Sequence, residues 1–298
     1  MTSSVEEEGG KKRATCLGYA SRLSPYEFKG VTGLPEVEES ERSLRKKLAK
    51  LVALVRASES IVALTGAGIS TAAGIPDFRG LKGIWTLEEK KKEGHRRKKV
   101  RTTKRSLGTS DDSSDTIAGL SFEAAVPTQT HMGLVALEKA NKLQWLATQN
   151  VDGLHFTSGF PRRKLAVLHG CVFTERCRRC DREYLRDYDV GGISFKPTGR
   201  FCETDNSELV DTILDWDDDL PDKEWDPTAA AFLNADLALC LGTSLRITPA
   251  ADLPLTSKQF VIVNLQKTPL DNQATLVIRA KVDTVITHLL NELNIPTT

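Results

Sequence analysis

The 298-residue sequence lacks any run of about eighteen apolar residues, the length that an α-helix needs to cross a membrane. We therefore expect no membrane span and no membrane partner. Residues 1–13 lack the apolar core of a secretory signal, so a reducing compartment is the expected setting. Basic and acidic residues nearly cancel, and a net charge of +1 does not by itself indicate a polyanionic partner. The composition is typical of a soluble globular protein with one or two domains.

Cysteine is scarce, and in a reducing compartment the six present are expected to be metal ligands or buried thiols. Cys177 and Cys180 have the C-x-x-C spacing of a zinc knuckle, and Cys202 follows 22 residues after Cys180. A second C-x-x-C from Cys202 would end at position 205, where the sequence has Asp205, whose carboxylate can also bind zinc. Three interpretations stay open: a Cys₃Asp zinc site, a site completed by another group, and a module without metal.

Hydrophobic periodicity predicts an α/β fold with parallel strands and helices on both faces of the sheet. The expected helices begin near residue 43 and cover 127–141 and 282–293; the expected strands begin at 61 and cover 144–148, 165–168, 237–241 and 260–264. All five strands end in polar turns, which predicts one composite site at their carboxyl ends. Residues 171–234 interrupt this rhythm and are interpreted as a small inserted module.

A second interruption, over residues 88–118, lacks apolar periodicity and is interpreted as a flexible insertion. Its first part, 90–105, has ten Lys or Arg residues and one acid, and the acidic, serine-rich run SDDSSD follows at 110–115. Such a basic block indicates a nuclear localisation signal or a nucleic-acid patch, although a merely solvated loop is the alternative.

The stretch 63–85, ALTGAGISTAAGIPDFRGLKGIW, begins at the end of a buried strand and is rich in glycine. Glycine allows a ligand to approach the backbone, and a strand followed by such a turn suits a phosphate. We therefore expect a nucleotide diphosphate here, with a tight ligand-free turn as the alternative. Asp77, Phe78 and Arg79 on the loop favour a site. A dehydrogenase is disfavoured because no complete G-x-G-x-x-G with a following acid is present.

Four further strand ends have the polar groups of a sugar and base site. Gln149, Asn150 and Asp152 can orient a sugar and stabilise positive charge, although such residues also favour turns. His169 has the side chain best suited to a general base near neutral pH. The turns GTS (242–244) and NLQ (264–266) fit the ribose and adenine side of a dinucleotide.

Together and in this order, these motifs resemble the sirtuin family of NAD-dependent protein deacylases. They are GAGIS (66–70), GIPDFRG (74–80), TQNVDGLH (148–155), LHG (168–170), CRRC (177–180), GTS (242–244) and VNLQ (263–266). The resemblance extends over about 17–293, and SPYEFKG, GLPE, GIW and DTILDW look like the nuclear sirtuin-six and sirtuin-seven branch.

The resemblance implies a Rossmann-like NAD-binding domain over 17–170 and 235–293, a zinc-ribbon-like module over 171–234 and a disordered N-terminus over 1–16. It implies acyl transfer from lysine to ADP-ribose with release of nicotinamide. His169 matches the general base, and Asn150 and Asp152 match the pocket around nicotinamide and its ribose. The positions that match NAD contacts are Ala67, Thr71, Phe78, Arg79, Trp85, Gln149, Gly242, Ser244, Asn264, Gln266 and Val282.

The implied cofactors are NAD as co-substrate and a structural zinc held by Cys177, Cys180, Cys202 and Asp205. The implied partners are acyl-lysine proteins, histones among them, with DNA or nucleosome contact through 90–105, and the implied localisation is nuclear. The alternative functions are mono-ADP-ribosyl transfer and a chromatin-binding module with weak catalysis. The sequence departs from the family pattern in the missing fourth cysteine, the basic insertion and Cys171 after the LHG motif.

Overall fold

The computed structural model describes residues 15–26, 29–101 and 121–297, with the backbone alone over 94–101. The helices are α1 (Cys16–Ala20), α2 (Glu41–Ala57), α3 (Ile84–Arg101), α4 (Gln129–Lys139), α5 (Leu154–Thr157), α6 (Asp222–Leu233) and α7 (Val282–Leu293). The short 3₁₀ turns are η1 (Ala67–Ile69), η2 (Thr71–Ala73), η3 (Phe122–Ala124), η4 (Arg162–Lys164) and η5 (Ala250–Thr256). The strands are β1 (Ile61–Thr65), β2 (Trp145–Thr148), β3 (Leu165–Val167), β4 (Thr174–Cys177), β5 (Glu183–Leu185), β6 (Pro197–Phe201), β7 (Glu208–Asp211), β8 (Leu237–Leu241), β9 (Phe260–Val263) and β10 (Leu276–Ile278).

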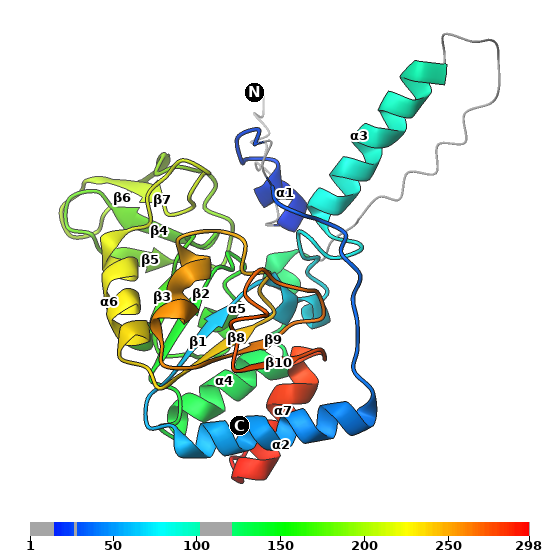
Figure 1. The fold of residues 1–298 in the computed structure, drawn as a ribbon. Helices are drawn as coiled ribbons and strands as arrows, with labels where there is room; N and C mark the ends of the chain where they lie inside the picture. The colour runs from blue at the N-terminus through cyan, green and yellow to red at the C-terminus, as the bar shows by residue number, and fades with distance from the viewer. Residues whose placement is uncertain (1–14, 27–28, 102–120, 298) are drawn as a thin grey trace, which may run out of the picture.

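The larger sheet has six parallel strands in the order β10-β9-β8-β1-β2-β3 (Figure 1). Strand β1 lies in the middle, with Val62 beside Trp145 on β2 and Ile61 beside Leu237 on β8. All five residues of β1 and of β8 are buried. Parallel strands covered on both faces read as continuous apolar runs, which explains the IVALT and LALCL segments.

Alternate residues of β1 face two separate cores. Ile61 and Ala63 join the core that contains the buried faces of α2, α4 and α7, whereas Val62 and Leu64 join the core that contains α6 and η5. Helices therefore cover both faces, and the predicted Rossmann-like architecture is confirmed.

The strand order reverses between β8 and β1, so the chain leaves these neighbours in opposite directions across the sheet. At such a switch point the loops after the two strands separate, and a crevice forms at their carboxyl ends. The loops concerned are 66–75, after β1, and 242–249, after β8.

A smaller antiparallel sheet, in the order β5-β4-β7-β6, is inserted after β3. Its own small core contains Cys177, Tyr184, Cys202 and Leu209. This sheet agrees with the predicted inserted module; the boundaries 171 and 234 stay predictions.

Helix α6 falls inside the range predicted for that module, although it packs on the larger sheet. Phe232 is fully buried in the core under that sheet, and the Trp145 indole on β2 donates a hydrogen bond to the Thr228 hydroxyl, at 3.0 Å. We therefore propose that the larger domain resumes at Asp222, because apolar burial holds α6 there.

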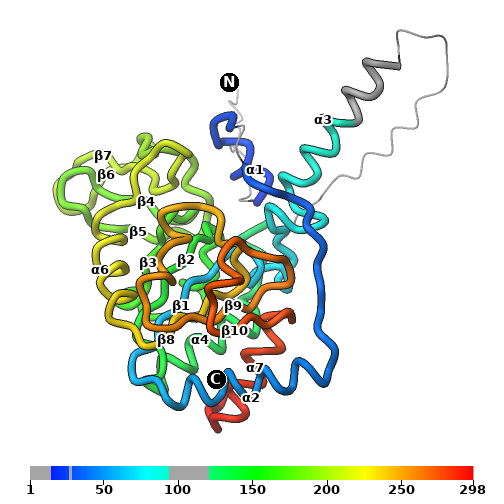
Figure 2. Tube along the Cα trace, viewed as in Figure 1, coloured from blue at the N-terminus to red at the C-terminus, as the bar shows by residue number. Residues whose placement is uncertain are grey.

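The predicted flexible insertion over 88–118 needs a correction. Helix α3 continues through Arg101, and residues 102–118 lie outside the described part of the chain. Ile84 and Trp85 are buried and anchor the first turn. The Lys, Arg and Glu residues that follow are strong helix formers, so the absence of apolar periodicity did not prevent a helix here. In Figures 1 and 2 the helix leads away from the sheets.

The N-terminal segment, residues 15–26 and 29–40, leads from α1 down one side of the molecule to α2 (Figure 2). Residues 1–14 lie outside the described residues, whereas Cys16, in the stretch expected to be disordered, begins α1 and is buried. The Ser24 hydroxyl donates to the Asp215 carboxylate at 2.6 Å, which ties this segment to the loop after β7. Among the described helices, none is long and apolar enough to cross a membrane.

Candidate active site

A cleft of about 480 Å³ opens at the carboxyl edge of the large sheet, at the point where the strand order reverses. Loops after β1, β2, β3, β8 and β9 all reach it, as the polar strand ends predicted. The predicted site residues that line it are Ala67, Phe78, Arg79, Trp85, Gln149, Asn150, His169, Gly242, Ser244, Asn264 and Gln266.

The floor of the cleft is a contact between the glycines of two loops. The Gly68 N–H donates to the Gly242 carbonyl at 2.8 Å, and a Cβ on Gly68 would lie 2.8 Å from that oxygen. A Cβ on Gly66 would lie 2.8 Å from the Thr243 Cα, and Gly242 has φ +59°, in the left-handed region. The glycines of this stretch are therefore required by loop packing, a reason that the sequence alone did not reveal.

A hydrogen-bonded chain fixes Asn150 at the end of β2. Its amide nitrogen donates to the Gly66 carbonyl at 3.2 Å and to the Ser70 hydroxyl oxygen at 3.3 Å. Ser70 in turn donates to the Asp152 carboxylate at 2.6 Å, and the Leu154 N–H donates to the other oxygen at 3.0 Å. Burial raises the pKa of Asp152, and these donors oppose that rise. Asp152 thus acts beneath the cleft by holding Ser70 and Asn150.

His169, two residues after β3, is held in one tautomer. Its Nδ1 lies 3.2 Å from the Gln149 carbonyl oxygen, and because a carbonyl only accepts, Nδ1 carries the proton. The lone pair is then on Nε2. Burial lowers the pKa of His169 to about 4, so the ring is neutral at physiological pH and ready to accept a proton.

The backbone around His169 fits against the loop after β7. The Leu214 N–H donates to the His169 carbonyl at 3.2 Å. Gly170 has φ +79°, and a Cβ there would lie 1.9 Å from the Thr212 carbonyl oxygen. No side chain fits at position 170, so the glycine of the LHG motif is a steric requirement.

An aromatic group forms one wall of the cleft. The ring centroids of Phe78 and Trp85 lie 4.7 Å apart, and those of Trp85 and Trp216 lie 5.3 Å apart. The Arg79 guanidinium lies over the Trp85 ring, 4.4 Å from its centroid, and its Nε donates to the Lys29 carbonyl at 2.9 Å. Burial lowers the pKa of Arg79 to about 10, so it keeps its charge at neutral pH. This wall is apolar with one fixed cation.

Amide side chains at two other strand ends brace the walls. Gln149 donates to the Thr243 hydroxyl at 2.8 Å and thereby links the loops after β2 and β8. Gln266 donates to the Leu34 carbonyl at 2.6 Å, which connects the loop after β9 to the N-terminal segment.

Three predicted residues do not line the cleft: Thr71, Asp152 and Val282. Thr71 is exposed and donates to the Gly68 carbonyl at 3.1 Å, whereas Val282 is buried at the start of α7. Their assigned contacts with the cofactor stay predictions.

The rim of the cleft on the side of α1 and α6 was not predicted. Unpredicted residues that line it include Tyr19, Leu23 and most of the segments 214–222 and 247–249. No motif covers Tyr19 or Leu23. The acidic run after Leu214 gave no sign that it borders a cavity, because an exposed acidic loop has the same composition.

The four predicted metal ligands meet in the small sheet. One ligand atom from each of Cys177, Cys180, Cys202 and Asp205 lies within 4.8 Å of the others. The sulfurs of Cys180 and Cys202 are 3.6 Å apart, and the Cys177 sulfur is 3.4 Å from an Asp205 oxygen. Tetrahedral zinc with ligands at its usual bond lengths separates them by about 3.5–3.8 Å. The donor set and its spacing therefore fit zinc.

Asp205 has the charge that such a site needs. The Ser207 N–H donates to its carboxylate at 3.0 Å and lowers the pKa of Asp205 to about 2, so it is ionised. Cys171, the other cysteine of this region, lies in the main core and is not in the cluster.

A model described as the Sir2 family matches residues 66–249, which include the glycine loops, His169 and the metal cluster. The chain belongs to the Sir2 family. The predicted sirtuin resemblance is therefore confirmed.

Relatives similar in sequence include plant and animal proteins. The chain is 47% identical to the NAD-dependent protein deacetylase SRT1 of Oryza sativa subsp. indica, over 94% of this chain and 55% of that protein. It is 38% identical to Sirt6 of Drosophila melanogaster, over 93% and 84%, and 35% identical to human sirtuin-7, over 87% and 63%. The sirtuin-six and sirtuin-seven similarity holds, and the plant protein is more similar than either. The chain spans about half the length of the plant relatives.

Solved Sir2 structures agree in fold. One contains a deacetylated p53 peptide and 3′-O-acetyl-ADP-ribose; it is 29% identical, with a TM-score of 0.60 over 84% of this chain and 100% of that one. A second contains a p53 peptide and NAD⁺; it is 28% identical, with a TM-score of 0.58 over the same shares.

Proposed function

We propose that this protein is an NAD-dependent protein-lysine deacylase that transfers the acyl group of an acyl-lysine to ADP-ribose and releases nicotinamide. The observation that carries the proposal is His169, neutral and held with Nε2 unprotonated, in the same cleft as Asn150 and the glycine loops. The names of the relatives and the ligands of the solved Sir2 complexes support the same reaction.

In this reaction NAD supplies the sugar carbon that the acyl oxygen attacks. Nε2 of His169 takes the proton from the ribose hydroxyl, since Nδ1 stays bound to the Gln149 carbonyl. Asp152 holds Ser70, and Ser70 holds Asn150. The side-chain amide of Asn150 is thereby placed near the positive charge that develops on the sugar. Phe78, Trp85 and Trp216 exclude water from the reacting end.

The zinc would be structural in this proposal. Four protein ligands close its coordination shell, which leaves no position for a substrate. Its expected contribution is to stabilise the fold of the small sheet.

The test is nicotinamide release from NAD in the presence and absence of an acetyl-lysine peptide. We expect release to require the peptide, and His169→Ala to lower it at least about a hundredfold because the general base is lost. His288→Ala, half-buried on α7 and outside the cleft, is the control and should leave the rate unchanged. Release without peptide, with ADP-ribose appearing on protein, would instead support mono-ADP-ribosyl transfer.

We also propose a nuclear localisation and action on chromatin proteins, histones among them, supported by the basic stretch 90–105. Deleting 90–105 should shift the protein out of the nucleus and weaken salt-dependent binding to DNA or nucleosomes. Unchanged localisation and unchanged binding would refute this role. A chromatin-binding module would be favoured if the parent protein has no deacylase activity and His169→Ala still binds nucleosomes.

A further inference from the structure

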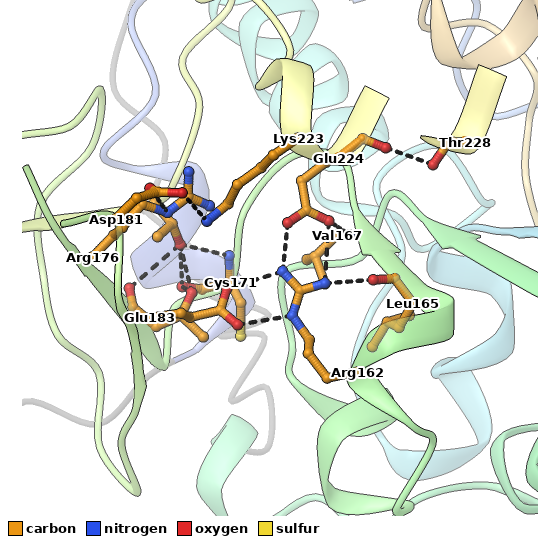
Figure 3. Close-up of polar contacts among 12 residues, drawn as sticks. Arg162, Leu165, Val167, Cys171, Arg176, Asp181, Glu183, Lys223, Glu224 and Thr228 are labelled. Carbon is orange, nitrogen blue, oxygen red and sulfur yellow. Dashed lines mark hydrogen bonds and ion pairs between the residues drawn. The ribbon is translucent and has the colours of Figure 1, made fainter. Parts of the chain in front are cut away.

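Arg162 lies at the junction of the two sheets, outside the cleft, with all five guanidinium N–H groups bonded to acceptors (Figure 3). Its Nε and Nη2 donate to the two oxygens of Glu183 on β5, at 2.8 and 3.1 Å. Its Nη1 and Nη2 donate to the two oxygens of Glu224 on α6, and Nη1 also donates to the Leu165 carbonyl on β3. One side chain thus joins β3, the small sheet and α6.

Glu224 also completes the edge of the large sheet. Strand β3 is an edge strand, and its Val167 N–H has no neighbouring strand to bond on that side. The Glu224 carboxylate accepts this N–H at 2.9 Å. Only 5% of the Glu224 side chain is exposed, so this carboxylate depends on Arg162 and Val167 for the hydrogen bonds that replace water.

A second link runs parallel to the first, one residue away on α6. Lys223 donates to the Asp181 carboxylate at 2.8 Å, and Asp181 directly follows the knuckle cysteine Cys180. The start of α6 therefore contacts the small sheet through Lys223 and the edge of the large sheet through Glu224 (Figure 3). A further tie, between Arg22 and Asp189, connects the N-terminal segment to the module.

Two of the three elements that Arg162 connects, β3 and α6, lead into the cleft. Val167 is two residues before His169, so the edge bond holds the strand end from which the base projects. Helix α6 begins at Asp222, where the cleft-lining segment 214–222 ends. A shift of the small sheet relative to β3 would therefore move His169 and the rim of the cleft with respect to each other.

The burial of this group distinguishes it from an ordinary surface ion pair. Exposed pairs contribute little, because water and salt screen them. Here the carboxylates are mostly buried, and the guanidinium contacts each through two N–H groups, a geometry that lysine cannot reproduce.

We propose that Arg162 is a positioning residue: through Glu224 it fixes the strand end that holds His169, and through Glu183 it sets the orientation of the small sheet. The inference rests on the proposed deacylase function for its kinetic consequences, whereas the hydrogen-bonding consequence is independent of any activity.

The first test compares Arg162→Lys with Arg163→Lys, the same substitution at the exposed neighbour. Arg162→Lys keeps the positive charge but loses the planar guanidinium that bonds both carboxylates. We therefore expect kcat/KM of Arg162→Lys to fall about tenfold, and that of Arg163→Lys to stay within about twofold of the parent. Zinc content and melting temperature are measured on the same samples. Loss of zinc or global unfolding that accounts for the lost activity would overturn a positioning role.

The second test separates the two arms. Glu224→Gln weakens the edge contact, so the Val167 amide should exchange with solvent about tenfold faster, and kcat should fall because His169 is less well held. Glu183→Gln releases only the small sheet, so KM for the peptide should rise while Val167 exchange stays as in the parent. Equal effects of the two variants on kcat, KM and exchange would contradict separate arms.

The exchange measurement distinguishes failure of this inference from failure of the proposed function. An inactive parent in which Arg162→Lys still speeds Val167 exchange would refute the deacylase assignment and support the link to β3. An active parent in which Arg162→Lys and Arg163→Lys behave alike in kinetics and exchange would refute the role of Arg162.

Discussion

At the scale of single residues, the site depends on buried polar groups, each of which has one or two specific hydrogen-bond partners. The neutral state of His169 follows from burial, and its orientation follows from one bond to the Gln149 carbonyl. Asp152 is buried with a raised pKa, and its two donors hold it in place. The protonation and orientation of each group therefore depend on its surroundings and not on its residue type alone.

The lowered pKa of His169 predicts the acid side of the pH profile. Because the free enzyme keeps the ring neutral down to pH about 4, kcat/KM should not fall with His169 protonation between pH 8 and about 5.5. Initial rates of nicotinamide release, measured across this range with folding checked by circular dichroism, test this. A decline centred near pH 6.5 would contradict it.

Two glycines with the same backbone conformation give a matched steric test. Gly170 and Gly159 both have φ +79°, but a Cβ meets the Thr212 oxygen at 1.9 Å in the first case and nothing within 4 Å in the second. Gly159→Ala should cost about 1–2 kcal/mol of stability from backbone strain alone. Gly170→Ala should cost more than about 4 kcal/mol or prevent folding, measured by urea unfolding. Equal losses of unfolding free energy in the two variants would contradict the prediction, because the close contact at position 170 would then add nothing to the backbone strain.

At the scale of elements, helices and loops act by bringing distant residues together. Helix α6 joins the large sheet through Phe232 and the small sheet through Lys223. The small sheet in turn brings together predicted metal ligands that lie 28 positions apart, Cys177 and Asp205. The small sheet has only a limited apolar core, and metal ligation is a common means of stabilising such a module.

The metal cluster predicts a specific response to changing its fourth ligand. Purified protein should contain about one zinc per chain, and Asp205→Ala should lose most of it on dialysis against a chelator because only three ligands remain. Asp205→Cys restores four ligands and should retain the metal. Glu203→Ala removes an exposed acid two residues away and serves as the control. Equal zinc in Asp205→Ala and the parent would exclude Asp205 as a ligand.

At the scale of the whole molecule, the interior contains a buried histidine pair next to the loop that follows β1. His131 on α4 and His155 on α5 have ring centroids 4.7 Å apart, and burial lowers the pKa of both, that of His131 to about 3. His155 hydrogen-bonds to Thr65 at the end of β1, whereas His131 hydrogen-bonds to Thr128 and caps α4. Stability as a function of pH should report on it.

The direction of this pH dependence follows from the pH at which His131 takes up a proton in the folded and in the unfolded chain. The unfolded chain takes up a proton at His131 near pH 6.5, whereas the folded chain does so only near pH 3, so stability falls as pH decreases through this interval. For His131 the loss at pH 5 relative to pH 8 is about 2 kcal/mol. His131→Gln, which preserves the capping position of α4, should reduce the difference in urea unfolding free energy between pH 8 and pH 5 by that amount. The same pH dependence in parent and variant would contradict the prediction.

The sequence by itself determined five of the six strands of the large sheet, the three helices that pack on one of its faces, and the polar strand ends that reach the cleft. Buried parallel strands must be apolar throughout, and their carboxyl ends must meet at one edge, so the strands and their polar turns were legible in order. The polar strand ends and the cysteine spacing then indicated His169, Asn150 and the four candidate metal ligands, which the structure brings together at the cleft and at the small sheet. The helical character of Ile84–Arg101 was missed because its stability comes from propensity and an anchored first turn, which leave no apolar stripe.

Only the tertiary structure decided the reasons behind these residues. Gly68 and Gly170 are glycines because other loops occupy the space of a side chain, and no local pattern encodes that neighbour. The proton on Nδ1 of His169 depends on the position of the Gln149 carbonyl, 20 residues away. Arg162 looks like an exposed basic residue beside Arg163 until Glu183 and Glu224 are placed around it. Such contacts are fixed by the packing of whole helices, strands and loops, so a local sequence pattern does not encode them.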